Sequence, residues 1–235
     1  MSPEHLPSAV TQDRVLGGRL VLCHARRLAD FGAGVGSAGL AALLHLPQAE
    51  AVLIEIDPAL ADLAGRNVVA NGFSERCGVV CADVLALARP GGPPRPAAEN
   101  LDLVLANPPF NVTQAHQTSP DAGRARAHMA DAETLRDWAT AAYRCLAPGG
   151  TLAMILRPED LSALLAALEG RFGAVRLLPV HPRPEAPAVR LIARAIKGRR
   201  TAPAILPGLI LAEAGGAPGA RAQAILSDGA ALDMG

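Results

Sequence analysis

The sequence predicts an α/β fold with a mostly parallel, seven-stranded sheet, an antiparallel strand near its C-terminal end and helices on both faces. Three observations lead to this prediction. Short apolar runs alternate with longer stretches of helical periodicity, which is the pattern of a parallel sheet. A glycine-rich turn separates the first apolar run from the first helical stretch. The last two apolar runs are joined by a short proline-rich turn, which indicates an antiparallel pair.

Apolar runs account for the predicted strands. The first run ends at the glycine-rich turn, and the fourth leads into a pair of prolines. In chain order, the strands are expected at residues 28–31, 51–56, 79–82, 101–106, 151–156, 175–180 and 189–196.

Start and stop signals mark the helices that are predicted between these strands. Pro47 closes the first helix, Pro58 lies in the first turn of the second, and Asn71-Gly72 stops it. The helices are expected at residues 37–46, 58–70, 131–146 and 159–172. Residues 89–100, rich in Pro, Gly and Ala, are expected to form a surface loop.

The length and composition predict one globular domain. The chain has 235 residues, of which 50% are hydrophobic and 19% charged, so it can bury a sizeable core. Residues 13–23 alternate around Gly17-Gly18, and a small hairpin cap is expected over residues 1–26. The main domain is expected over residues 27–200, with residues 201–235 as an extension of the same domain.

Several functional classes are not supported by the composition. The six histidines are scattered, and the cysteines Cys23, Cys77, Cys81 and Cys145 form no Cys-x-x-Cys pair, so no metal site is expected and the thiols are expected to be buried. No apolar run is long enough to span a membrane, and the N-terminus does not read as a signal peptide. The expected location is therefore the cytoplasm.

The glycine-rich turn, residues 30–36, has the context of a nucleotide-binding loop. Glycines there allow positive φ and let a ligand touch backbone N–H groups. Glu55 ends the next strand, where an acid can accept both hydroxyls of a ribose, and Asp83 ends the third, where it can accept from an adenine amine. The leading Asp30 would repel a pyrophosphate but suits an amino group, which favours S-adenosylmethionine over NAD as the cofactor.

The turn Asn107-Pro108-Pro109-Phe110 follows the fourth strand and predicts methylation of an amine. Two prolines fix the backbone and remove two N–H donors. The side-chain oxygen of Asn107 and the carbonyl of Pro108 can then accept the two hydrogens of one amine and aim its lone pair at a methyl donor. Such an acceptor needs positioning more than a strong base. Phe110 offers a face for a flat acceptor to stack on.

Together, residues 30–36, Glu55, Asp83 and residues 107–110 resemble the amino-methylating class I methyltransferases, which have a Rossmann-like fold. A closer resemblance is to the bacterial tRNA1(Val) adenine-37 N6-methyltransferases. It is carried by residues 13–20 and by the Asn-Pro-Pro-Phe turn, residues 107–110. Further support comes from Ser119-Pro120-Asp121 followed by Arg124, Ala125, Arg126 and His128, and from the Lys197-Gly198 and Leu206-Pro207 segments. The resemblance implies cofactor-binding roles for Asp30, Gly32, Ala33, Gly34, Gly36, Glu55, Ile56, Asp83, Val84 and Asn107.

Two features depart from that family. Most members carry Tyr where this chain has Phe110, but stacking needs only the ring. Most also have a further segment between the hairpin and the first strand, including a helix that closes over the methionine end of the cofactor. Here residues 23–27 run directly into the strand. Either this chain lacks that helix, or a segment is missing from the sequence at this point. We favour the second explanation, because loss of the helix would expose the core.

The resemblance implies tRNA as the partner, with the chain acting as a monomer. The net charge is zero, but residues 171–200 hold eight basic residues and a single acid, Glu185. Such a local patch can attract phosphates. The expected RNA contacts are Arg124, Arg126, His128, Arg190 and Lys197.

Three other functions remain open at this point. A guanine-N2 methyltransferase of ribosomal RNA and a protein glutamine N5-methyltransferase use a similar turn. The glutamine enzymes usually carry a separate helical N-terminal domain, which this sequence lacks. A non-catalytic RNA-binding scaffold could retain the fold, although intact Asp30, Glu55 and Asn107 argue against it.

Overall fold

The structure is a computed structural model that describes residues 25–87, 99–108, 120–226, 232 and 234. The predicted N-terminal hairpin lies outside these residues. So do Pro109, Phe110 and most of the 89–100 loop. For residues 120–131 the backbone is described and the side chains are not.

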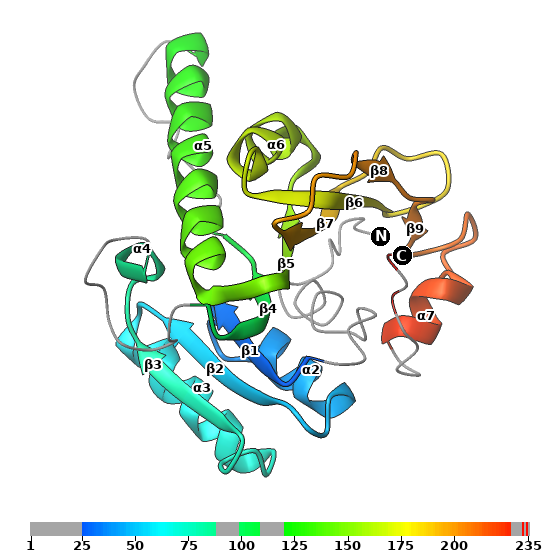
Figure 1. Cartoon of the computed structure of the whole chain (residues 1–235). Coiled ribbons are helices and arrows are strands. Elements are labelled where there is room, and N and C mark those ends of the chain that lie inside the picture. The colour runs from blue at the N-terminus through cyan, green and yellow to red at the C-terminus, as the bar shows by residue number, and fades with distance from the viewer. Residues whose placement is uncertain (1–24, 88–98, 109–119, 227–231, 233, 235) are drawn as a thin grey trace.

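Within the described residues, the strands form one nine-stranded sheet in the order β3-β2-β1-β4-β5-β7-β6-β8, with β9 also pairing with β6 (Figure 1). Strands β1 to β5 run parallel to one another, and β7 is antiparallel to both β5 and β6. The strands are β1 (Arg27–Phe31), β2 (Glu50–Glu55), β3 (Cys77–Cys81), β4 (Leu101–Ala106), β5 (Leu146–Leu156), β6 (Phe172–His181), β7 (Arg190–Lys197), β8 (Ala204–Ile205) and β9 (Leu209–Ile210).

The predicted fold class and its seven strands are confirmed, and two short strands extend the sheet. Strands β8 and β9 pair in parallel with the outer edge of β6. Each has only two residues, too few to show a periodic pattern in the sequence. They form because the edge of β6 offers backbone hydrogen-bond partners. Strand β5 begins at Leu146, the last residue of the helix that was expected over residues 131–146. A register shift between Leu101 and Leu103 of β4 accommodates the extra residues of β5, which include Gly149 and Gly150.

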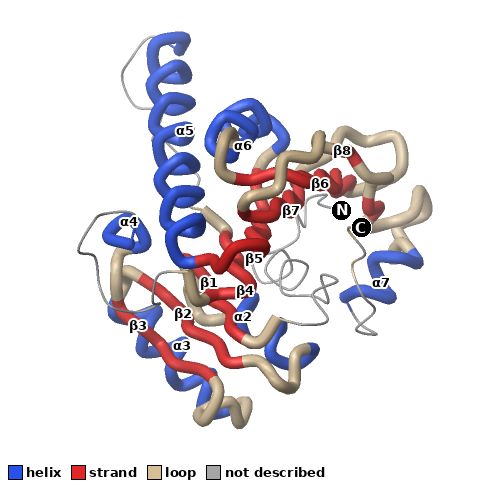
Figure 2. Tube along the Cα trace, viewed as in Figure 1, coloured by secondary structure: helices blue, strands red, loops and turns tan. Residues whose placement is uncertain are grey.

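Helices cover both faces of the sheet (Figure 2). On one face lie α2 (Ser37–His45), α3 (Pro58–Ala70) and α7 (Ala220–Leu226). On the other lie α4 (Val84–Leu87), α5 (Pro120–Cys145) and α6 (Leu161–Leu168), the last preceded by the short helix η1 (Pro158–Asp160). Each face therefore has its own hydrophobic core, with alternate residues of every central strand pointing into each.

Several helices differ from the prediction. Helix α7 was not predicted, and α6 ends at Leu168, where a helix extending to residue 172 was expected. Helix α5 begins at Pro120, well before the expected residue 131. The prediction missed the first half of this helix because that half lacks the apolar periodicity on which the prediction depended. Proline is tolerated in the first turn of a helix. The four-residue α4 was not predicted, since one turn carries no periodic pattern.

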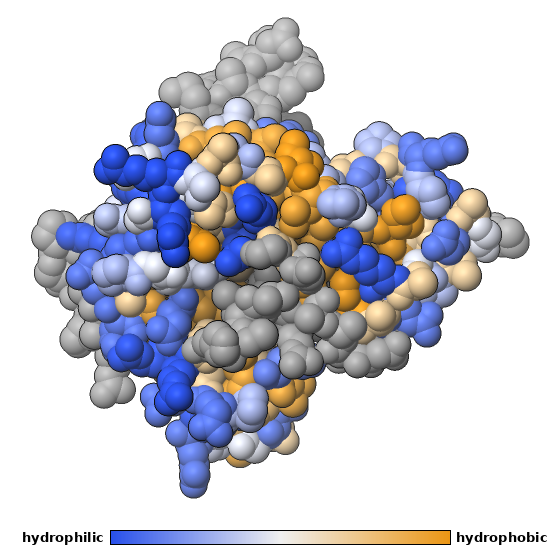
Figure 3. All heavy atoms as spheres, turned by 45° about the vertical axis from the view of Figure 1, so that its right-hand side comes forward, coloured by the Kyte–Doolittle hydropathy of each residue, from blue (hydrophilic) through white to orange (hydrophobic). Residues whose placement is uncertain are grey.

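Hydrophobic residues also reach the surface. On the face drawn in Figure 3 they lie among strongly hydrophilic residues. This mixture is ordinary for a folded protein, because apolar atoms supply more than half of a typical accessible surface. Within the described residues, no helix is long and apolar enough to cross a membrane.

Candidate active site

The candidate site lies where the strand order reverses. From β1 the chain proceeds outward through β2 and β3, then returns to the other side of β1 as β4. Phe31, the last residue of β1, pairs with Ile54 of β2 and Ala106 of β4. Gly32, Glu55 and Asn107 therefore follow next to one another at the carboxyl ends of three adjacent strands, which is where open α/β sheets bind ligands.

The loop after β1 has the backbone that its glycines were predicted to provide. Gly32, Gly34 and Gly36 have φ of 64°, 54° and 88°, in the left-handed region that favours glycine. The Ala33 N–H donates to the Ile54 carbonyl at 3.0 Å, which ties the loop to β2. A Cβ atom placed on Gly34 would meet no atom within 4 Å, so space for a ligand lies against the loop at this residue.

Asp30 anchors the loop to helix α2. Its side chain is buried, and its Oδ2 atom accepts a hydrogen bond of 2.8 Å from the Gly39 N–H in the first turn of α2. A carboxylate there is stabilised by the positive end of the helix dipole. The acid that was predicted to face an amino group is thus also a structural link between β1 and α2.

Replacing Gly39 by alanine is expected to lower the free energy of unfolding by about 1–3 kcal/mol, the usual cost of overpacking a core. The added Cβ would overlap Leu53 Cδ2 and lie 3.2 Å from the Asp30 carboxylate. Chemical denaturation measures the change. The matched control is Gly65→Ala in α3, where a Cβ meets nothing within 4 Å and the change should stabilise the helix by roughly 0.5–1 kcal/mol. Equal effects of both substitutions would contradict this packing.

Glu55 holds the loop from the other side. It is buried, its Oε2 accepts from the Gly34 N–H at 2.7 Å, and its Oε1 accepts from the Asp57 N–H at 2.9 Å. Asp57 in turn caps α3 by accepting from the Ala59 and Leu60 N–H groups. The carboxylate therefore joins the loop to the start of α3, a role that the sequence did not reveal because both partners are backbone groups.

The other predicted cofactor residues lie beside these acids. Ile56 has 63% of its surface exposed, so it offers an apolar face at the edge of the site, whereas Val84 is buried in the core. Asp83 Oδ1 accepts from the Leu85 N–H at 2.8 Å and begins α4. Of this group, Ile56 is the side chain best placed to contact a flat ring.

Asn107 and Pro108 follow directly after β4, next to the loop. Asn107 is half-buried and Pro108 is buried. Because Pro109 and Phe110 lie outside the described residues, their roles stay predictions. The turn thus begins at the expected place, with Asn107 adjacent in register to Gly32.

A further side chain supports the loop and was not predicted. Asn67 of α3 donates through Nδ2 to the Val35 carbonyl at 2.9 Å. The contact joins residues 32 positions apart, and only the packing of α3 against β2 brings them together.

The expected RNA contacts fall into two regions. Arg124, Arg126 and His128 lie in the first half of α5, the end of the helix that projects away from the sheet in Figure 1. Arg190 begins β7, half-buried, with its Nη1 donating to the Val189 carbonyl at 2.7 Å. The role of both regions in RNA binding stays a prediction.

Lys197 occupies a position that does not favour an RNA contact. Its side chain is only 5% exposed, and its Nζ donates to the Leu146 carbonyl at 2.7 Å and to Glu99 Oε1 at 2.9 Å. The ammonium also lies 4.4 Å from the centre of the Tyr143 ring. These partners give Lys197 a structural role at the end of α5 in place of the expected RNA contact.

Lys197→Met is expected to lower the free energy of unfolding by about 1–3 kcal/mol, because the Leu146 carbonyl loses a charged donor. Thermal or urea denaturation measures the loss. Arg199→Met is the matched control in the same basic stretch, since Arg199 is exposed, and it should leave stability unchanged. A Lys197→Met protein as stable as the wild type, with weakened RNA binding, would restore the original expectation for Lys197.

The cysteines are not all buried as expected. Cys77 and Cys145 are buried, and burial raises the pKa of each thiol to about 11. Cys81 is exposed at the end of β3, so the prediction is wrong for this residue. Cys23 lies outside the described residues. Among the described side chains, no cluster of His, Cys, Asp and Glu could hold a metal ion.

A cavity of about 570 Å³ lies away from these groups. Its lining includes Arg27, Glu50, Cys77 and Leu101, the first residues of β1 to β4. It is thus at the amino ends of the strands, opposite the glycine loop and Asn107. Among the residues that the structure describes, none of the predicted cofactor or catalytic residues lines it.

The residues at the carboxyl edge suit S-adenosylmethionine better than a dinucleotide. Two buried carboxylates, Asp30 and Glu55, lie under the loop, where they would repel a pyrophosphate. A carboxylate can accept several hydrogen bonds, as an amino group and ribose hydroxyls require. The open space at Gly34 and the exposed Ile56 leave room for the ligand along the strand ends.

Sequence relatives point to the same class. Residues 13–181 match the methyltransferase small domain family. The chain is 32% identical over 162 residues to a Porphyromonas gingivalis protein named tRNA1(Val) (adenine(37)-N6)-methyltransferase, covering 66% of this chain and 61% of that protein. It is also 31% identical over 156 residues to the ribosomal RNA small subunit methyltransferase C of Hahella chejuensis, covering 64% and 38%. The chain thus spans 61% of the Porphyromonas relative's length.

Solved structures agree with this assignment. A predicted O-methyltransferase from Agrobacterium tumefaciens, the protein Atu636, superimposes with a TM-score of 0.78 at 29% identity, over 94% of this chain and 98% of that one. A SAM-dependent O-methyltransferase from Thermotoga maritima shares the fold, with a TM-score of 0.53 at 15% identity over 85% and 68%. The chain therefore belongs to the methyltransferase small domain family, and its cofactor is S-adenosylmethionine.

Proposed function

We propose that this protein transfers a methyl group to the exocyclic N6 amine of an adenine in tRNA. The observation that carries the proposal is the position of Asn107. It is the first residue of the Asn-Pro-Pro-Phe sequence that follows β4, and it lies next in register to the cofactor loop. A tRNA substrate would place the activity in the cytoplasm, and we expect the protein to act as a monomer.

The chemistry of the turn suits an amine conjugated to a ring. Asn107 Oδ1 and the Pro108 carbonyl would accept the two hydrogens of the amine, which holds its lone pair toward the cofactor side of the site. When bound, S-adenosylmethionine supplies an electrophilic methyl group. A correctly aimed lone pair can attack without a strong base, so positioning and charge stabilisation account for catalysis. Phe110 would stack on the ring of the base.

Two features support RNA as the source of the adenine. A base in a single-stranded loop can be turned into a pocket at modest cost. Arg124, Arg126 and His128 follow the turn on α5. Arg190 begins β7, and Arg199 and Arg200 follow its end within the same basic stretch, so side chains of both regions could contact phosphates. The name of the Porphyromonas relative is consistent with this substrate.

Ribosomal RNA is the second candidate substrate. The Hahella relative is named for it, and a guanine N2 amine could be held by the same two acceptors. A glutamine amide, a hydroxyl acceptor like that implied by the Agrobacterium protein's name, and a non-catalytic scaffold are further outcomes that an assay can distinguish.

The test is methyl transfer from labelled S-adenosylmethionine to unmodified total tRNA, followed by nucleoside analysis. We expect label in N6-methyladenosine. Label in N2-methylguanosine of ribosomal RNA, in a protein amide or at a hydroxyl would replace the proposed acceptor with the one labelled. Calorimetry with S-adenosylhomocysteine tests the non-catalytic scaffold, because absence of binding would be consistent with that function and with none of the methyltransferases.

A further inference from the structure

The cofactor loop is held from both faces of the sheet. On the α2 and α3 face, Asp30 binds Gly39, and Asn67 binds the Val35 carbonyl. On the opposite face the support comes from α5, where Trp138 lies against the first glycine of the loop. Its spacing along the helix does not distinguish Trp138 from the other buried residues of α5.

The Trp138 ring lies directly against the backbone of Gly32. A Cβ atom placed on Gly32 would be 2.7 Å from Trp138 Cη2 and 3.5 and 3.6 Å from Cζ3 and Cζ2. Real Cβ atoms do not approach another atom so closely, so the ring occupies the volume that a side chain at residue 32 would need. The loop can cross the ring at this distance because residue 32 is glycine.

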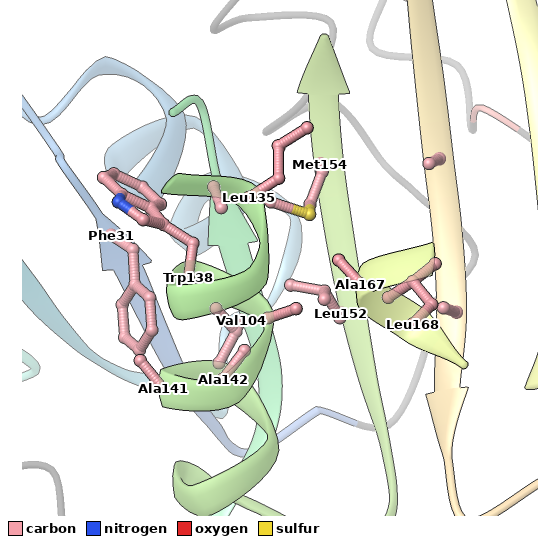
Figure 4. Packing of buried hydrophobic residues seen from close by; sticks show 14 of the residues in the cluster. Phe31, Val104, Leu135, Trp138, Ala141, Ala142, Leu152, Met154, Ala167 and Leu168 are labelled. Atoms are coloured by element: carbon pink, nitrogen blue, oxygen red, sulfur yellow. The ribbon is translucent and has the colours of Figure 1, made fainter. Parts of the chain in front are cut away.

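The ring itself is firmly fixed. Trp138 is 6% exposed, and its indole meets Phe31 edge to face, with ring centres 6.4 Å apart and planes at 73°. Figure 4 shows the two rings together between α5 and β1, with Leu135 near them. Such edge-to-face pairs contribute about 0.5–1.5 kcal/mol beyond the area they bury. The ring under Gly32 is therefore buried and packed against β1.

We infer that Trp138 is a positioning residue for S-adenosylmethionine. It sets the height of the glycine loop above the sheet and thereby the position of the backbone groups that face the cofactor. It acts through Gly32 and Phe31, which places cofactor affinity partly under the control of helix α5. The inference concerns the cofactor alone and does not depend on which acceptor is methylated.

Wild-type fluorescence provides the first test, because Trp138 is the one tryptophan of the chain. Titration with S-adenosylhomocysteine, exciting tryptophan selectively, should change the emission. The change should saturate with the Kd found by calorimetry. Calorimetric binding without any change in emission would overturn the inference, because the loop would then bind its ligand independently of the ring.

Substitution provides the second test. Trp138→Phe leaves a gap under Gly32 and is expected to raise the Kd for S-adenosylhomocysteine about tenfold, equivalent to about 1.4 kcal/mol. Phe172→Leu is the matched control: Phe172 is a buried ring of the same core, packed edge to face on Tyr143. It should lower the melting temperature while leaving the Kd unchanged. Equal effects on the Kd would mean that Trp138 only fills the core.

A double substitution distinguishes direct contact from general loosening. Gly32→Ala alone should weaken binding severely, since the new Cβ meets the Trp138 ring and φ is +64°. Adding Trp138→Phe removes the overlap but not the backbone strain. The double variant should therefore bind S-adenosylhomocysteine more tightly than Gly32→Ala alone. If the losses in binding free energy of the two single variants simply add in the double variant, the inference is overturned, even if each single variant is less stable than the wild type.

Discussion

Asn107→Ala is expected to lower kcat by about a hundredfold or more while leaving the Kd for S-adenosylhomocysteine nearly unchanged. The substitution removes one of the two acceptors that would hold the amine, so the lone pair is no longer aimed at the methyl group. The main cofactor contacts that we expect lie on the loop after β1 and on Glu55, which remain intact. Single-turnover kinetics with tRNA and calorimetry with S-adenosylhomocysteine measure the two quantities separately.

The other end of β4 offers a matched control. Asn100 precedes the strand at its amino end and accepts a hydrogen bond from Arg27, far from the cofactor loop. Asn100→Ala should leave both kcat and the cofactor Kd unchanged. If Asn107→Ala weakens cofactor binding as much as turnover, the turn is a structural element and the proposed chemistry is wrong.

Glu55→Gln is the second substitution with a large expected effect. Both carboxylate oxygens of Glu55 accept from backbone N–H groups, one on Gly34 and one on Asp57. An amide has a single acceptor oxygen, so its NH₂ group must face one of these donors. Hydrogen bonds to charged groups contribute about 1.5–3 kcal/mol, so the Kd for S-adenosylhomocysteine should rise by about ten- to a hundredfold. Calorimetry measures this change.

Glu50→Gln is the control for the charge itself. Glu50 starts the same strand and is exposed, and it should tolerate the change without loss of affinity. A Glu55→Gln protein that binds the cofactor normally would show that the carboxylate neither fixes the loop nor touches the ligand. The melting temperature adds a second readout, because the start of α3 loses a partner as well.

Much of the fold was predictable because its signals are local. Each central strand is a short apolar run, and the turns after β1 and β4 carry glycines and prolines whose backbone preferences depend on few neighbours. The elements that were missed lack such signals. Strands β8 and β9 depend on the free edge of β6, and the first half of α5 has no apolar periodicity.

The sequence by itself determined the seven longer strands of the sheet, the loop after β1, and the strand ends that carry Glu55, Asp83 and Asn107. What only the tertiary structure decided is how these residues are held. Lys197 belongs to a basic stretch, yet it is buried against Leu146, 51 positions away. Trp138 has ordinary helical spacing, yet it supports Gly32. Both facts arise from packing between segments far apart in the chain, and spacing along one segment contains no information about such contacts.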